Sequence, residues 1–127
     1  MASPADRKYT KEHEWVKVDG DVATMGITDF AQDQLGDIVY VDLPEPGTAI
    51  KQFEKMGEIE SVKAVSDLFA PISGEVIEGN AQIVDKPELV NSDAQGEGWL
   101  LKVRLSDASE TDALLSAEDY DAFVAAA

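Results

Sequence analysis

The sequence predicts a mainly β protein: one small antiparallel β-sandwich domain spanning residues 1–127, with short flanking helices. Short segments rich in β-branched and aromatic residues are separated by turns that contain glycine, proline or aspartate. A length of 127 residues, 44% of them apolar, suffices for a single hydrophobic core. We expect that core to be built from about residue 9 to residue 105.

Four segments have the alternation or the β-branched content that is typical of strands. They are residues 14–18, residues 22–27, residues 38–43, and a stretch beginning near Trp99 that includes Leu101, Val103 and Leu105. Asp19-Gly20-Asp21 separates the first two segments and predicts a hairpin. Pro44-Glu45-Pro46-Gly47 ends the third.

Capping residues predict two short helices. The first covers residues 29–35, with Thr28 as its N-cap and Gly36 after its last turn. The second covers about residues 117–124 in an acidic tail, where Ser116 and Asp119 resemble a capping box. One face of each helix is apolar and is expected to face the core: Phe30, Ala31 and Leu35 on the first, and Tyr120, Phe123 and Val124 on the second.

The charge and the rare residue types exclude several functions. With 26 acidic and 10 basic residues the net charge is −16, which disfavours nucleic acid and anionic membranes as partners. The chain has no cysteine and only one histidine, so we expect no metal site and interpret His13 as structural. It shows neither an apolar run long enough for a membrane span nor a targeting segment. We expect a cytoplasmic monomer that is not itself an enzyme.

Lys63 lies at the centre of the most informative segment. Two β-prone pieces, residues 57–62 and 64–67, flank it and place it near the tip of a hairpin. A lysine amine in water is protonated at neutral pH, so this lysine is better suited to being modified than to acid–base catalysis. On spacing alone, an unmodified lysine in a solvated turn is the simpler interpretation. A weak repeat surrounds it, because Gly47-x-x-Ile50 and Gly74-x-x-Ile77 are 27 residues apart.

Glu60-Ser61-Val62-Lys63-Ala64 resembles the lipoyl-attachment motif of the glycine cleavage system H protein family. Other segments resemble the same family in the same order, and together they cover about residues 9 to 104: YTKEHEW at 9–15, GIT at 26–28, LGDIVYVDLP at 35–44, APISGEV at 70–76 and GEGW at 96–99. Gly47 and Gly74 stand 16 residues before and 11 residues after Lys63, the offsets typical of lipoyl domains. The chain departs from the family at Gln34, Ala94 and Gln95, where members often have His, Pro and Tyr.

The resemblance implies a lipoyl/biotinyl-type β-sandwich (a barrel-sandwich hybrid) that carries lipoate in amide linkage on Lys63. It implies a carrier that takes an aminomethyl group from a pyridoxal-phosphate glycine decarboxylase to a tetrahydrofolate-dependent aminomethyltransferase. An FAD-containing dihydrolipoyl dehydrogenase would then reoxidise the arm, and lipoylating enzymes would attach the cofactor.

The resemblance also implies supporting roles for three residues. Glu60 and Gly74 would help lipoylating enzymes recognise the hairpin, although a plain turn role is equally open for both. Glu14 would lie beside the groove in which the loaded arm rests, where its carboxylate would pair with a cationic amine.

Two alternatives stay open. The chain could be a lipoyl or biotinyl carrier of another multienzyme complex, but Val62 and Ala64 replace the methionines that normally flank a biotinylated lysine. The lipoyl domains of 2-oxoacid dehydrogenases usually have Asp before Lys-Ala and lack the His-Glu-Trp opening. It could also be an unmodified adaptor of the same fold.

Overall fold

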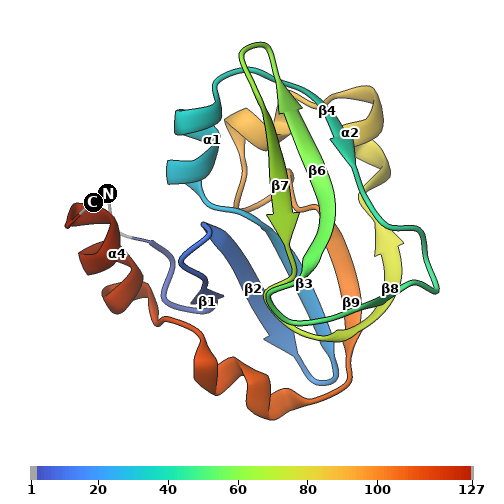
Figure 1. Ribbon diagram of the computed structural model, residues 1–127, viewed down its shortest axis with the longest axis vertical. Helices are drawn as coiled ribbons and strands as arrows, with labels where there is room; N and C mark the ends of the chain where they lie inside the picture. The colour runs from blue at the N-terminus through green and yellow to red at the C-terminus, as the bar shows by residue number, and fades with distance from the viewer. Residues whose placement is uncertain (1–2, 127) are drawn as a thin grey trace.

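A computed structural model describes residues 3–126, which form two antiparallel sheets around a common core (Figure 1). The larger sheet has the order β1 (Lys8–Tyr9), β2 (Glu14–Asp19), β3 (Val22–Ile27), β9 (Leu101–Leu105), β8 (Gly74–Gly79), β5 (Ala49–Ile50). The smaller sheet has the order β4 (Ile38–Asp42), β6 (Lys55–Ser61), β7 (Val65–Phe69). The predicted antiparallel sandwich is confirmed.

The main core lies between the two sheets. Buried side chains alternate along the strands, as on Leu101 and Val103 of β9, and pack against Ile59 and Leu68 of the smaller sheet. The predicted hairpin joins β2 to β3 through Gly20, whose φ of 66° suits a tight turn. The last strand begins at Leu101 rather than near Trp99.

Both predicted helices are present. Helix α1 (Asp29–Leu35) begins where Thr28 Oγ1 accepts a hydrogen bond from Ala31 N, and it ends at Gly36, whose φ is 79°. Helix α4 (Ala117–Ala125) begins where Ser116 Oγ accepts one from Asp119 N. Three short elements were not predicted, because they have too few turns for an apolar period: α2 (Ala81–Asp85), α3 (Leu89–Ser92) and the 3₁₀ helix η1 (Ala108–Ala113).

One expectation about α1 is wrong. Ala31 and Leu35 pack against the main core as predicted, but Phe30 packs against the His13 ring, with the centroids 4.8 Å apart and the planes tilted by 46°. His13 precedes β2 on a backbone with a φ of 70°, and its ring also lies near the rings of Tyr120 and Phe123 on α4. Phe30 therefore joins this aromatic group rather than the main core.

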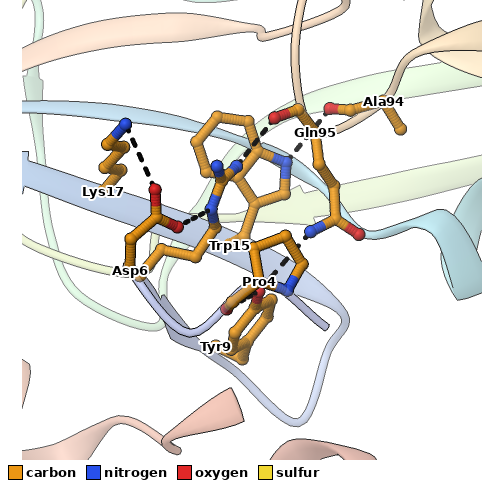
Figure 2. Close-up of polar contacts among 8 residues, drawn as sticks. Pro4, Asp6, Tyr9, Trp15, Lys17, Ala94 and Gln95 are labelled. Carbon is orange, nitrogen blue, oxygen red and sulfur yellow. Dashed lines mark hydrogen bonds and ion pairs between the residues drawn. The ribbon is translucent and has the colours of Figure 1, made fainter. Parts of the chain in front are cut away.

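A second, smaller core joins the chain ends to the larger sheet. It contains Tyr9, Trp15, Ala117 and Tyr120, with Trp99 packed against them, so both tryptophans contribute to packing as expected. Figure 2 shows the polar contacts around Trp15, whose indole N–H donates to Ala94 O at 3.1 Å. The Arg7 guanidinium lies 4.6 Å from the centre of the Trp15 ring and donates to Gln95 O. Thus the loop that departs from the family pattern is held by Arg7, which precedes β1, and by Trp15 of β2.

No helix within residues 3–126 combines the length and the apolar character needed to cross a membrane.

Candidate functional site

Lys63 is exposed at the tip of the β6–β7 hairpin, at the top of Figure 1. Residues 61–64 form the turn, closed by a hydrogen bond of 2.8 Å from Ser61 N to Ala64 O. Ser61 Oγ accepts further hydrogen bonds from the N–H groups of Lys63 (3.3 Å) and Ala64 (3.1 Å). Within residues 3–126 the Lys63 ammonium forms no ion pair. The turn is therefore ordered by its own polar groups, while the amine is left accessible.

The connection between α1 and β4, residues 36 and 37, contacts this turn. Val62 N donates to Asp37 O at 3.0 Å. A Cβ added to Gly36 would lie 3.5 Å from Lys63 Cε, so the lysine stem crosses the C-terminal end of α1. At that distance a Cβ would make ordinary van der Waals contact with the stem, so the φ of 79° is the stronger reason for glycine at this position.

Asn91 of α3 holds the same connection, and the sequence analysis did not identify it. Its Nδ2 donates to Gly36 O, and its Oδ1 accepts from Ile38 N, both at 2.8 Å. These partners are 53 and 55 residues away in sequence, so no local pattern connects them to Asn91. One amide side chain therefore fixes both ends of the segment on which the Lys63 turn rests.

Glu60 and Gly74 lie in different surroundings. Glu60 is exposed in the central strand of the smaller sheet, directly before the turn. Gly74 is buried at the start of β8, where an added Cβ would collide with the carbonyl oxygen of Arg104 on β9. Gly47 has open space around it but a φ of 91°. The two glycines of the repeat are thus required for different reasons: close strand approach at Gly74 and a left-handed backbone at Gly47.

Glu14 is buried, whereas the resemblance implied a carboxylate facing a surface groove. Only 2% of the residue is exposed. Its Oε1 accepts from Thr10 Oγ1 at 2.6 Å, and its Oε2 accepts from Phe69 N at 3.3 Å. Burial raises the pKa of Glu14 to about 7, and these hydrogen bonds oppose the shift only in part. The carboxylate therefore ties β2 of the larger sheet to the edge strand β7 of the smaller one.

A surface hollow of about 380 Å³ lies above this carboxylate. Thr10 and Phe69, the two residues that donate to Glu14, are part of its wall. Its aromatic lining includes Tyr9 and Phe53, and Phe53 is 53% exposed with a φ of 67°. Glu14 itself does not line the hollow, so it influences the shape of the hollow only by holding Thr10 and Phe69 in place.

His13 is held by hydroxyl groups. Its Nδ1 lies 2.8 Å from Tyr120 Oη, which is itself 2.7 Å from Thr28 Oγ1. Burial lowers the pKa of His13. In the described part of the chain no three His, Asp or Glu side chains are grouped so that they could hold a metal ion.

The two antiparallel sheets form a β-sandwich of the lipoyl type, the fold of lipoyl carrier domains. The chain belongs to the glycine cleavage H-protein family, whose model matches residues 7–127. This family consists of lipoyl carriers of the glycine cleavage system, which implies that enzymes of that system are its partners.

Similar proteins support the family assignment. A glycine cleavage system H protein of Symbiobacterium thermophilum is 58% identical over 120 residues, covering 94% of each chain. One of Carboxydothermus hydrogenoformans is 53% identical over 118 residues, covering 93% of this chain and 91% of that protein. The crystal structure of such a protein from Mycobacterium marinum matches with a TM-score of 0.89 and 41% identity, covering 97% of this chain and 99% of that one.

Proposed function

We propose that this chain is the lipoyl-bearing shuttle of the glycine cleavage system, with lipoate attached to Lys63 as an amide. Its partners would be the glycine decarboxylase, from which it accepts an aminomethyl group, the folate-dependent aminomethyltransferase and the dihydrolipoyl dehydrogenase. When attached, lipoate supplies a disulfide that can be reduced and reoxidised, chemistry that a chain without cysteine lacks.

The observation that carries this proposal is the presentation of Lys63. The amine is exposed and free of ion pairs within residues 3–126, while its turn is held by Ser61 and by Asp37 O. A fixed turn with a free amine suits a side chain that must enter the active site of a modifying enzyme. After acylation the same turn would be a fixed anchor for a long arm, which raises the concentration of the arm's end at each partner.

The protein's own residues act as support. We propose that Glu60 contributes to recognition of the hairpin and that Gly74 keeps β8 and β9 in close register. We propose that Glu14 stabilises the end of the arm from beneath the hollow, through the wall formed by Thr10 and Phe69. The high negative charge favours a monomer, because copies of the chain repel one another.

The test of the carrier role is Lys63→Arg. Arginine keeps the positive charge, but its guanidinium does not form the lipoyl amide. We expect intact-protein mass spectrometry to show one lipoyl addition on the wild-type chain after incubation with lipoic acid, ATP and a lipoate–protein ligase, and none on Lys63→Arg. Glycine cleavage in a reconstituted four-protein assay should fall to background with the variant.

Lys55→Arg is the matched control, because Lys55 lies on the same hairpin but is paired with Glu58 and Asp67. It should be lipoylated and active. A lipoyl addition on Lys63→Arg, or full activity of that variant, would place the cofactor on another residue and refute the proposal.

A further inference from the structure

Large apolar side chains are exposed around Lys63. Seven large hydrophobic residues are exposed among residues 3–126, and four of these belong to β4 or the hairpin tip: Val39 (45%), Tyr40 (57%), Val62 (69%) and Val65 (61%). Single exposed hydrophobic residues are ordinary, but a contiguous group on a small protein indicates an interaction surface.

Strand pairing places Tyr40 and Val65 on one face of the smaller sheet. Tyr40 on β4 is opposite Glu60 on β6, and Glu60 is opposite Val65 on β7. Directly opposed residues point to the same side of a sheet, so the three form a row across it. An irregularity between Ile38 and Tyr40 breaks the alternation, so that Val39 and Tyr40 are both exposed.

The next row on this face is acidic. Asp42, Glu58 and Asp67 are opposed across the same three strands, two residues farther from the tip. Lys55 pairs with Glu58 at 2.7 Å and with Asp67 at 3.2 Å. Among residues 3–126, Asp42 and Glu60 have no ion pair. The apolar row is therefore bordered, and at Glu60 interrupted, by negative charge.

We propose that the face formed by Val39, Tyr40, Glu60, Val62 and Val65 is the docking surface for the enzyme that acylates Lys63. Hereafter it is called the hairpin face. Around the entrance to its active site, this enzyme would present an apolar surface that packs on the apolar row. Lysine or arginine side chains beside that surface would pair with Glu60 and the acidic row. This inference rests on the proposed function, since it requires Lys63 to be acylated.

The chemistry of acylation selects this occupant. The neutral Nζ amine attacks the carbonyl carbon of an activated lipoyl donor, an acyl adenylate. The new C–N bond forms as the C–O bond to AMP breaks, AMP leaves with the electron pair of that bond, and the nitrogen gives up one proton to water. Nζ must therefore lie inside the enzyme's active site during this step. Because the lysine side chain is only a few bonds long, the residues beside Lys63 must then contact the enzyme's surface. Enzymes that act at the far end of a finished arm have no such need to approach the turn.

The experiment uses the unmodified full chain with a purified lipoate–protein ligase, lipoic acid and ATP. KM and kcat for the protein substrate are measured by intact-protein mass. We expect Tyr40→Ser and Val65→Ser each to raise KM about tenfold or more with little change in kcat, because they remove binding contacts and leave the reacting atoms in place. Tyr40→Phe should restore most of the loss.

The control is Val18→Ser, which removes an exposed apolar side chain from the end of β2, opposite the hairpin tip (Figure 1). Its KM should stay within about twofold of wild type. In addition, kcat/KM of the wild-type chain should fall as salt rises from about 0.05 M to about 0.5 M, and Glu60→Gln should weaken that dependence. Circular dichroism must show every variant folded.

Three results would overturn the inference. One is an unchanged KM in the folded serine variants; another is normal acylation combined with impaired aminomethyl transfer, which would assign the hairpin face to a later partner. The third is a wild-type dimer that Tyr40→Ser dissociates, which would make it an interface between copies. Failure of the proposed function is seen separately, as acylation of Lys63→Arg.

Discussion

At the scale of single residues, Glu14 shows how one buried carboxylate joins two sheets. Its oxygens accept from Thr10 Oγ1 and from the backbone N–H of Phe69 on an edge strand. That N–H would otherwise lack a partner at the edge of the sheet. The hydrogen bonds offset only part of the cost of burying a charge, because the pKa of Glu14 is raised from 4.5 to about 7.

Stability should therefore depend on pH through Glu14. Below pH 4.5 the carboxyl is protonated in both the folded and the unfolded chain; between pH 4.5 and about 7 only the unfolded chain ionises, so stability falls as pH rises. In urea unfolding, the free energy of unfolding of Glu14→Gln should rise relative to that of wild type by on the order of 1–3 kcal/mol between pH 4 and pH 8. A difference between the two proteins that does not change with pH would contradict the raised pKa.

At the scale of elements, a chain of hydrogen bonds through two hydroxyl groups connects α1 with α4. Tyr120 Oη lies 2.7 Å from Thr28 Oγ1, which also accepts from Ala31 N, and 2.8 Å from His13 Nδ1. Burial lowers the pKa of His13, which favours the neutral ring in this chain. The Tyr120 ring also stacks on Tyr9 with their centroids 4.8 Å apart.

Tyr120→Phe isolates the hydroxyl. Phenylalanine keeps the stacking on Tyr9 but leaves the hydroxyl of Thr28, a residue only 1% exposed, and His13 Nδ1 without their partner. We expect urea unfolding to show a loss of about 1–3 kcal/mol. Tyr40→Phe, at a residue 57% exposed, should cost less than about 0.5 kcal/mol. Equal losses in the two variants would mean that the hydroxyl chain does not stabilise α4.

At the scale of the whole molecule, charge is the dominant feature. The net charge is −16, and 26 acidic side chains have only 10 basic ones to pair with. Mutual repulsion of like charges destabilises a compact state, and dissolved ions screen it.

The melting temperature should consequently rise with salt. Between about 0.02 M and about 0.5 M NaCl we expect an increase of a few °C, measured by calorimetry or circular dichroism at neutral pH. KCl should have the same effect as NaCl, since screening does not distinguish the two cations. A flat or falling melting temperature would show that repulsion contributes little to the stability of this fold.

Local features of the chain were predictable from sequence because their interactions span few residues. Gly20 makes the β2–β3 turn, Thr28 and Ser116 cap their helices, and Lys63 lies in a turn closed by Ser61 and Ala64. In each case the chemistry that determines the conformation lies within about four residues of chain. The family motif then pointed to Lys63 within that turn.

Tertiary structure alone decided what surrounds these local features. The burial of Glu14 depends on Phe69, 55 residues away, and the base of the lysine turn depends on Asn91, contributed by a helix too short to be predicted. The exposure of both Val39 and Tyr40 follows from irregular pairing with β6, which a period-2 pattern does not encode. Burial and strand register are set by which distant segments meet, so they become defined only when the two sheets close on one core.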